Sequence, residues 1–382
     1  MTVFSRTDTS LLSNWWWTVD RRMLMMLGLL IGLGILMTLS ASPAIAEKLG
    51  LDPFHFVKRQ MFFICLGGVM MFSISLLPII WIRRLGVGLF LISLVLLALT
   101  MAIAPEAKGA RRWLRLGSFT LQASEFLKPA FIVFTAWMFA ETQKTPGFKG
   151  WTISLLSYGI VVFFLINQPD FGQTILITIV WGTQFFMAGL PMIWVMGLAG
   201  FGIAGILSAY LFLPHVTSRI DRFISPETGD TYQVDTAMNA FRSGGLFGRG
   251  PGEGAVKKIL PDAHTDFIFA VTGEEFGIVL CLVLIVLFAV IVVRGLMRIM
   301  KESDLFIFLA VSGLMIQFGV QAFINLGVNL SLLPSKGMTL PFISYGGSSF
   351  LSTAIAMGMV LSLTRRGSRD NLENLNSAWR QI

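Results

Sequence analysis

The chain alternates long apolar stretches with shorter polar connectors. A helix needs about 20 apolar residues to cross the hydrocarbon core of a bilayer, and ten stretches approach that length. They lie near residues 23–42, 60–80, 85–104, 124–141, 152–167, 172–189, 192–213, 266–293, 304–326 and 343–364. The pattern predicts an all-α integral membrane protein with about ten transmembrane helices.

The ends of the chain are predicted to be polar tails, residues 1–22 and 365–382, around a membrane domain of residues 23–364. The first apolar stretch stands where a cleavable signal peptide would. We interpret it as a retained span, because the tail before it carries Trp15–Trp17 and Arg21–Arg22. Such residues are typical of an anchor at the membrane interface.

The composition excludes an ordinary soluble domain. Hydrophobic residues make up 55% of the chain and charged residues 13%, whereas soluble domains have about 25% charged residues. The formal net charge is +8, so the position of the few basic residues carries information. Cys65 and Cys281 both lie inside apolar stretches, and we expect neither a disulfide nor a metal site from them.

Basic residues in the short connectors predict the orientation. The connectors on the same side as Arg21 and Arg22 contain Arg83, Arg84, Lys144, Lys149, Arg294, Arg298, Lys301, Arg365, Arg366 and Arg369. By the positive-inside rule this side is cytoplasmic, and both termini lie on it. The opposite side carries three larger connectors, near 105–123, 214–265 and 327–342, the second of which is a large loop between spans seven and eight.

The outer connectors hold basic residues as well. They are Lys108, Arg111, Arg112, Arg115, Arg219, Arg222, Arg242, Arg249, Lys257, Lys258 and Lys336. In one interpretation long loops cross the membrane regardless of charge, and these side chains contact lipid headgroups. In the other they bind an anionic ligand, which supplies the partner that cations on the disfavoured side require.

Three ionisable residues stand at the edges of apolar stretches. Asp266 directly precedes the apolar run 267–271, where partial desolvation makes a carboxylate a stronger base. Glu125 and Lys128 are three residues apart on one helix face and can form an ion pair. Ionisable residues at membrane depth are functional candidates. A purely structural pair between two helices is the alternative for Glu125 and Lys128.

Two connectors have backbones suited to a ligand site. Residues 244–254 are rich in glycine and precede Lys257 and Lys258, which favours either an anion cradle or a flexible loop without a ligand. Proline and glycine interrupt helix within residues 325–349, and irregular backbone at membrane depth is buried in protein or lines a cavity. Asp170 either belongs to the same cavity or caps the sixth span.

Other chemistry has no support in the sequence. His55, His215 and His264 lack metal-ligand spacing, and there is neither a G-x-S-x-G nucleophile motif nor a Walker loop for ATP. The energy for a reaction must therefore come from the substrate or from a gradient.

Four ordered motifs resemble those of the SEDS family of peptidoglycan glycan polymerases, which are multispanning bacterial inner-membrane proteins. They are "GARRW" with "SEFLKP", "QPDFG", "LPDAHTDFIFAVTGEEFG" and "LLPSKGMTLPFISYGGSS". The last motif and the opening "NWWWTVDRR" are more similar to the cell-division branch than to the elongation branch. Ala123 stands where the family usually has Pro, and Asp262 and Ser331 stand where it often has Glu and Gly.

The resemblance implies a glycosyltransferase that polymerises lipid II on the periplasmic face of the cytoplasmic membrane, in septal wall synthesis. It implies that Asp266 is the essential carboxylate, acting as a general base. The substrate-binding set that we predict is Arg111, Arg112, Glu125, Lys128, Lys257, Lys258, His264 and Lys336. Of these, the arginines and the two neighbouring lysines are expected at the pyrophosphate, because guanidinium groups grip phosphate well.

The resemblance also implies partners. A class B penicillin-binding transpeptidase, other division proteins and membrane lipid are expected, and no nucleic acid. A divalent cation, Mg²⁺ or Mn²⁺, could help to neutralise pyrophosphate, although no ligand cluster in the sequence demands one.

Three alternative functions stay open at this stage. A lipid II flippase predicts charges distributed along a path through both leaflets, whereas the outer cations crowd one face. An elongation-type polymerase is the second choice, because the last motif and the opening stretch are more similar to the division branch. A scaffold for division proteins would leave Asp266 without a role.

Overall fold

The computed structural model describes residues 10–106, 111–117, 119–189, 192–212, 217, 221, 232–334 and 337–365. The helices are α1 (Leu11–Thr18), α2 (Arg21–Lys48), α3 (His55–Ser75), α4 (Ile79–Ile103), α5 (Ala123–Lys144), α6 (Gly150–Asn167), α7 (Phe171–Met187), α8 (Met192–Phe212), α10 (Tyr232–Gly244), α11 (Ile268–Ile299), α12 (Leu305–Asn329) and α13 (Gly347–Leu363). The described residues also form a 3₁₀ turn, η2 (Val256–Lys258), and two strands, β1 (Leu114–Leu116) and β2 (Phe119–Leu121).

The ten predicted apolar stretches correspond in order to α2 to α8 and α11 to α13, and the stretch 60–80 also reaches the first two residues of α4. Among the described helices, α2, α3, α4, α6, α11 and α12 are long and apolar enough to cross a membrane. The helices α7 and α13 are apolar but only 17 residues long. The prediction of a mostly helical membrane protein is confirmed. Stretches with the apolar length that a bilayer requires coincide with the observed helices.

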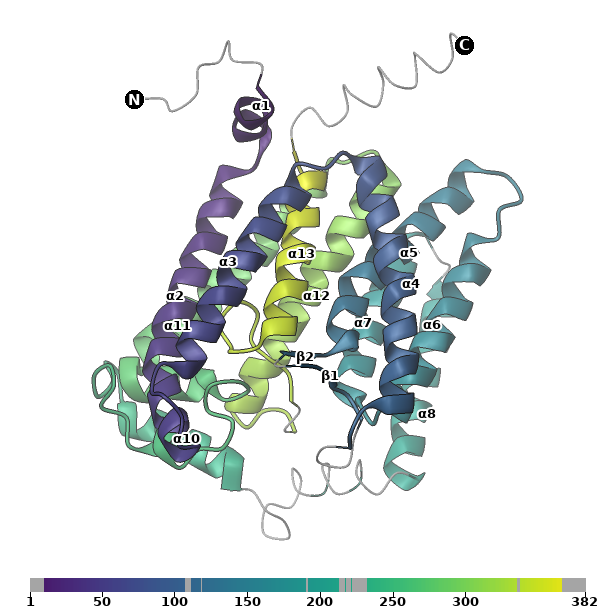
Figure 1. Ribbon diagram of the computed structural model, residues 1–382. Helices are drawn as coiled ribbons and strands as arrows, with labels where there is room; N and C mark the ends of the chain where they lie inside the picture. Colours follow the sequence, from purple (N-terminus) through teal and green to yellow (C-terminus); the bar gives the residue numbers. More distant parts are fainter. Residues whose placement is uncertain are drawn as a thin grey trace.

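The long helices run side by side and alternate in direction (Figure 1). Helix α1 and the C-terminal end of α13 lie together at one end of the bundle, which we call the terminal end. Helix α10 and the segment 245–267 lie at the other end, which we call the loop end. The described part of the large connector before α11 therefore lies at the end opposite to α1.

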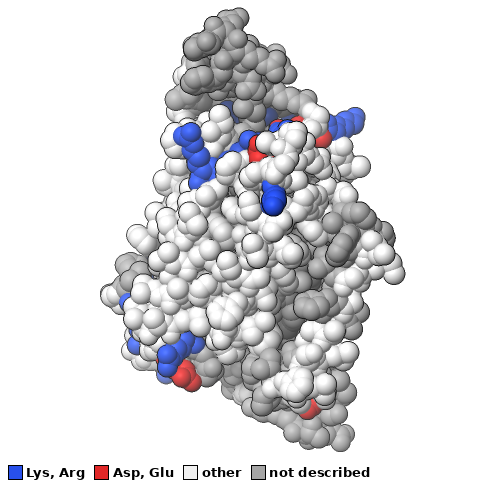
Figure 2. Space-filling view, turned by 90° about the vertical axis from the view of Figure 1, so that its right-hand side faces the viewer, with Lys and Arg blue, Asp and Glu red and all other residues white. Residues whose placement is uncertain are grey.

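The outer surface is apolar between the two ends. Figure 2 shows Lys, Arg, Asp and Glu side chains near the top and the bottom of one face, with a broad band of other residues between them. On α4, Leu91, Ile92 and Val95 are between 56% and 67% exposed. Such a surface is stable next to hydrocarbon and costly next to water.

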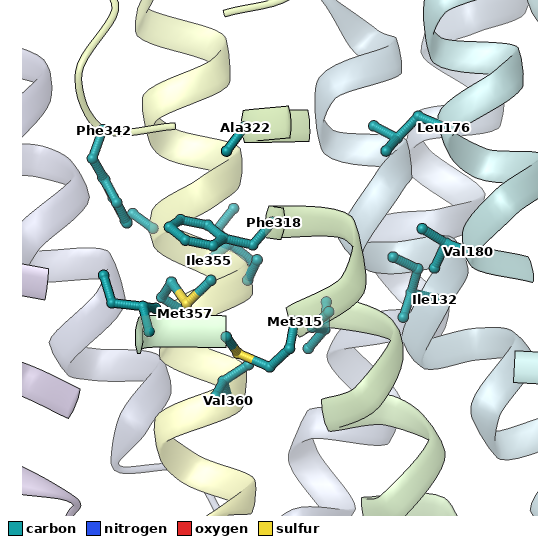
Figure 3. Packing of buried hydrophobic residues seen from close by; sticks show 14 of the residues in the cluster. Ile132, Leu176, Val180, Met315, Phe318, Ala322, Phe342, Ile355, Met357 and Val360 are labelled. Atoms are coloured by element: carbon teal, nitrogen blue, oxygen red, sulfur yellow. The ribbon is translucent and has the colours of Figure 1, made fainter. Parts of the chain in front are cut away.

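Helix α12 forms the centre of the bundle. In its most apolar window 72% of the residues are buried, against 11% to 39% in the other five candidate spans. Its Met315 and Phe318 pack toward Ile355 and Val360 of α13 (Figure 3). A helix that is surrounded by others can carry polar side chains, because neighbouring helices supply their hydrogen-bond partners.

Helix α11 is broken, whereas we predicted one continuous span over 266–293. Gly277 has φ 78° and ψ 177°, a conformation that glycine adopts at little cost. The loop backbone meets the break, where the Ile278 N–H donates to the Gly245 carbonyl at 3.0 Å. A Cβ atom at Gly277 would lie 2.3 Å from the Leu246 carbonyl oxygen. The close approach of the loop therefore requires glycine here.

A small antiparallel hairpin departs from the all-α prediction. It lies in the connector before α5, where β1 and β2 pair Leu114 with Leu121 and Arg115 with Thr120. Gly117 has φ 62° and allows the tight turn. Leu114 is 4% exposed. Its burial anchors the hairpin at the entrance to α5.

Candidate functional site

Asp266 lies at the loop end, in the turn that leads into α11. The N–H groups of Thr265 and Phe267 donate to the Asp262 carbonyl at 3.1 and 3.3 Å and close this turn. Phe267 and Ile268 are buried at 3% and 0% exposure, whereas Asp266 is half-buried. The chain anchors two apolar residues in the bundle and leaves a carboxylate at its boundary.

Two amides of α12 hold the backbone of Asp266. Asn325 and Asn329 each donate an Nδ2–H hydrogen bond of 2.9 Å to the Asp266 carbonyl oxygen. Asn325 also donates to the Met338 carbonyl at 2.7 Å, and Asn329 Oδ1 accepts from the Ala270 N–H at 3.1 Å. Both asparagines are at most 2% exposed. Buried amides with several satisfied partners fix the position of the backbone that they bind.

Gln321 continues this polar face one helical turn earlier. Residues four apart lie one above the other on a helix, so Gln321, Asn325 and Asn329 form a line that we call the amide row. Gln321 Nε2 donates to the Thr339 carbonyl at 3.1 Å, and its Oε1 accepts from Lys128 Nζ at 2.9 Å. The amide row therefore connects α5 to the Asp266 turn.

Glu125 and Lys128 form the predicted ion pair near the start of α5. Lys128 Nζ lies 2.8 Å from Glu125 Oε2, and the two side chains are 1% and 6% exposed. Gln173 Nε2 of α7 donates to Glu125 Oε1 at 2.7 Å. A buried ion pair is stable only when further hydrogen bonds satisfy both ions. Gln173 and Gln321 supply these bonds.

The connector between α12 and α13 packs against the Asp266 turn. The Tyr345 N–H donates to the His264 carbonyl at 2.9 Å. A Cβ atom at Gly337 would lie 3.4 Å from Asp266 Oδ2, so the backbone passes directly beside the carboxylate. The connector between α12 and α13 therefore lies beside Asp266. Backbone hydrogen bonds hold its described part.

His264 packs in a cluster with two aromatic rings, Phe56 and Tyr345. Its ring centroid is 4.8 Å from that of Phe56 and 5.3 Å from that of Tyr345, and Arg59 is hydrogen-bonded to Tyr345. Burial lowers the pKa of His264 to about 4, so its imidazole is neutral at neutral pH. A neutral ring supplies no positive charge to a phosphate, and this geometry favours a packing role over the predicted substrate contact.

Lys257 and two glutamates of α11 brace the glycine-rich loop. Lys257 Nζ pairs with Glu275 and donates to the Ser40 carbonyl at 3.0 Å, and its side chain is 5% exposed. Glu274 accepts from the N–H groups of Val256 and Lys257 at 2.7 and 2.9 Å. The contacts of the Lys257 ammonium group with Glu275 and Ser40 favour a structural role over the predicted pyrophosphate contact. The loop is braced at these points.

The remaining predicted cations have different settings. Arg112 donates from Nε to the Gln168 carbonyl at 3.0 Å and thereby braces the turn before α7. Arg111 and Lys258 are exposed to the surroundings. Lys336 lies outside the described residues.

Asp170 caps α7, as one of the two interpretations predicted. Its Oδ1 accepts from the Gln173 N–H at a long 3.5 Å. Burial raises the pKa of Asp170, while the positive charge of Arg112 works in the opposite direction. Its Oδ2 has no hydrogen-bond partner within the described part of the chain.

The amide row was missed in the sequence. Its signal is the run "QAFINLGVN" (321–329), which places an amide at every fourth position of an apolar helix. A buried amide needs a partner, so this spacing predicts a polar contact across helices. The bracing role of Glu274 and Glu275 was missed too, because their loop partners lie 17 to 23 residues earlier in the chain.

The arrangement joins a half-buried carboxylate, a buried ion pair and exposed basic residues. A carboxylate can accept a proton from a hydroxyl group, and guanidinium and ammonium groups can bind an anionic leaving group. No group of three or more His, Cys, Asp or Glu side chains that could hold a metal ion occurs within the described ranges.

Comparison with known proteins points to one family. Residues 21–369 match the FtsW/RodA/SpoVE family model, which is described as "Cell cycle protein". The probable peptidoglycan glycosyltransferase FtsW of Caulobacter vibrioides is 49% identical over 364 residues, which cover 95% of this chain and 93% of that protein. The protein of the same name from Trichlorobacter lovleyi is 35% identical over 359 residues, 90% of this chain and 93% of that protein.

Solved structures agree with this similarity. A chain of a peptidoglycan synthase complex that coordinates polymerization and crosslinking has a TM-score of 0.76 at 26% identity, covering 93% of this chain and 99% of that chain. The rod shape determining protein RodA of Thermus thermophilus has a TM-score of 0.67 at 27% identity, covering 91% and 97%.

Proposed function

Because the chain belongs to the FtsW/RodA/SpoVE family of cell cycle proteins, we propose that it is a peptidoglycan glycosyltransferase that polymerises lipid II in septal wall synthesis. Its relatives over nearly the whole chain are probable peptidoglycan glycosyltransferases of the FtsW type. The observation that carries the proposal is Asp266, a half-buried carboxylate whose backbone is held by two buried asparagines.

The proposed reaction joins two lipid II molecules. The 4-hydroxyl of the acceptor's N-acetylglucosamine attacks the anomeric carbon of the donor's N-acetylmuramic acid, and Asp266 accepts the hydroxyl proton. The new β-1,4 bond forms as the α bond to undecaprenyl pyrophosphate breaks, and the electron pair leaves with the pyrophosphate. A positioned general base contributes about 10²–10⁴-fold in rate.

The leaving group requires positive charge. We assign this role to Arg111, Lys258 and Lys336, because Lys257, His264 and Arg112 make their contacts within the protein. Glu125 and Lys128 shape the protein beneath the substrate rather than bind it directly, since both are buried. A divalent cation such as Mg²⁺ or Mn²⁺ would take its oxygen ligands largely from the pyrophosphate.

We also propose the membrane arrangement. Ten helices, α2 to α8 and α11 to α13, cross the bacterial cytoplasmic membrane, with the loop end in the periplasm. The terminal end, with both termini, is cytoplasmic, because the basic connectors described above gather there. Lipid II polymerisation then takes place on the periplasmic side.

The partner that we propose is a class B penicillin-binding transpeptidase of the FtsI type, which crosslinks the strands that this chain makes. The similarity to a chain of a synthase complex that coordinates polymerization and crosslinking supports this assignment.

The decisive experiment is polymerisation of purified lipid II by the purified chain, with and without the transpeptidase. Asp266→Asn keeps the size and the hydrogen-bonding capacity of the side chain but removes the basic charge. We expect this variant to bind lipid II and the transpeptidase and to make no glycan strands. Strand length on a gel and lipid II binding are measured on the same preparation.

Asp262→Asn is the matched control. Asp262 has φ 52°, and asparagine tolerates this left-handed conformation as well as aspartate does. We expect near-normal strand synthesis from this control. Normal synthesis by folded Asp266→Asn would refute the general-base assignment. Transport of lipid II by a wild-type protein that makes no strands would favour a flippase.

A further inference from the structure

A groove lies between α2 and α11 near the terminal end of the bundle. It has a volume of about 640 Å³, and its rim carries Asp20, Arg22, Arg294 and Arg298. The groove is remote in the fold from Asp266, which lies at the opposite end of α11. The proposed glycosyl transfer does not use it.

The rim has an excess of positive charge. Asp20 accepts two hydrogen bonds from Arg294, at 2.7 and 2.8 Å, and also caps α2 through the N–H groups of Arg22 and Met23. Both oxygens of the Asp20 carboxylate therefore accept hydrogen bonds within the protein. Arg294 Nε is buried without a hydrogen-bond partner among the described residues, and Arg22 is exposed. The lining thus carries three guanidinium groups and one carboxylate. Arg294 is the one that pairs with Asp20, and Arg298 donates to the Thr364 carbonyl at 3.4 Å. An anion bound there would balance the excess of positive charge.

The wall of the groove is apolar and exposed. Val286, Val290 and Val293 lie on one face of α11 and are 58%, 45% and 52% exposed. They precede Arg294 and Arg298 along the same helix. The distance from Val286 to Arg298 along the axis is roughly 18 Å at 1.5 Å per residue, which is close to one leaflet of the roughly 30 Å hydrocarbon core.

Nearby residues place the rim at the level of lipid headgroups. Arg21 stacks over the rings of Trp16 and Trp17, with its Cζ atom 5.0 and 4.5 Å from the two centroids. Tryptophan and arginine at the end of a membrane helix are typical of the interface between hydrocarbon and water. The lining of the groove begins at Val286 and so covers one leaflet, although exposed apolar residues of α11 continue to Ile278.

We propose that this groove binds one anionic phospholipid, with its phosphate at Arg22, Arg294 and Arg298 and an acyl chain along the valine wall. Charge complementarity selects the headgroup, and the length of the apolar wall selects a single leaflet. The bound lipid joins α2 to α11 at the level where the two helices leave the membrane.

The test uses the full chain in detergent, titrated with dioleoyl phosphatidylglycerol or dioleoyl phosphatidylcholine. Bound lipid is counted by native mass spectrometry, and the thermal midpoint is recorded. We expect the wild-type protein to retain phosphatidylglycerol preferentially and to gain thermal stability from it. This comparison needs no variant, so it remains decisive if a variant fails to fold.

Two variants locate the site. The double variant Arg22→Gln/Arg298→Gln should weaken phosphatidylglycerol binding about 30-fold, because each basic residue near such a surface contributes about 1 kcal/mol. Ala289→Trp should fill the groove, which Ala289 lines, and abolish binding without any change in charge. Arg84→Gln is the control, since Arg84 is an exposed arginine of α4 that stacks on Trp81.

Several outcomes would overturn the proposal. Equal retention of phosphatidylcholine would remove the role of charge, and equal binding by the double variant would place the lipid elsewhere. Equal competition by soluble glycerol phosphate would mean that the acyl wall has no role. Release of a co-purified membrane protein by Ala289→Trp, with lipid binding unchanged, would assign the groove to a partner helix.

Discussion

Asp266 is positioned through its carbonyl group, which accepts hydrogen bonds from Asn325 and Asn329. The chain thereby separates the group that holds the residue from the group that is proposed to react. A general base must stand within hydrogen-bond reach of the proton that it takes, and small displacements of a reacting group are costly in rate. The asparagines are positioning residues under this proposal.

Replacement of Asn329 tests this role. Asn329→Ala removes a hydrogen bond to Asp266 and one of the two acceptors of the Ala270 N–H, which also donates to the Phe267 carbonyl. A lost buried hydrogen bond costs about 1–3 kcal/mol. We expect kcat for lipid II polymerisation to fall about tenfold or more while KM changes little. Gln317→Ala is the control, because Gln317 is a buried amide of α12 one turn outside the amide row. An unchanged kcat in both Asn329→Ala and Asn325→Ala would reduce the asparagines to packing residues.

The ion pair of α5 allows a second comparison. Lys128→Met leaves the Glu125 carboxylate buried without its cation, and breaking a buried pair costs about 3–5 kcal/mol. We expect a clear drop in the thermal midpoint together with loss of polymerisation. Glu125→Lys/Lys128→Glu should recover the midpoint more fully than the activity. Lys144→Met removes an exposed pair with Asp304 and should cost less than about 1 kcal/mol. Equal effects of Lys128→Met and Lys144→Met would contradict this account.

At the scale of elements, the break in α11 is the least replaceable feature. Gly277→Ala would place a Cβ atom 2.3 Å from the Leu246 carbonyl, at a φ of 78°. We expect little folded protein, measured as the monodisperse fraction after detergent extraction. Gly28→Ala in α2 meets no atom within 4 Å and should be neutral or slightly stabilising. Normal yield and thermal midpoint for Gly277→Ala would mean that the loop can move away from α11.

Helix positions were predictable from the sequence, whereas the break and the hairpin were not. The length of an apolar stretch is a local property, and α12 at 305–329 lies within a few residues of the predicted 304–326. The break at Gly277 depends on a loop that arrives from residues 245–250. A carboxylate at the boundary of a span could be identified as Asp266, but its partners on α12 are about 60 residues away.

The candidate site shows the same division between local and distant information. Glu125 and Lys128 are three residues apart, so their pairing followed from helix geometry. Lys257 could not be assigned in this way. Its burial against Glu275 depends on the folded path of the glycine-rich loop, and the sequence alone shows only a basic residue in an outer connector.

At the scale of the whole molecule, the proposed topology makes the terminal and loop ends accessible from opposite sides. Lys149 and Glu253 are both exposed, one in the connector between α5 and α6 and the other in the loop before α11. In a background of Cys65→Ala and Cys281→Ala, we expect Glu253→Cys to react with an impermeant thiol reagent in intact cells. Lys149→Cys should react only after the membrane is opened. Labelling of both in intact cells would exclude this arrangement.

The placement of both charges of the ion pair on α5 also affects the synthesis of the protein. A lone charge at the centre of a helix costs about 2.5–3.5 kcal/mol during insertion by the translocon. Glu125 and Lys128 leave the ribosome together and can neutralise each other at once, whereas Gln321 is made 193 residues after its partner Lys128. Helix α5 can therefore enter the bilayer before α12 exists. The late arrival of α12 then completes hydrogen bonds whose most costly charges have already been paired.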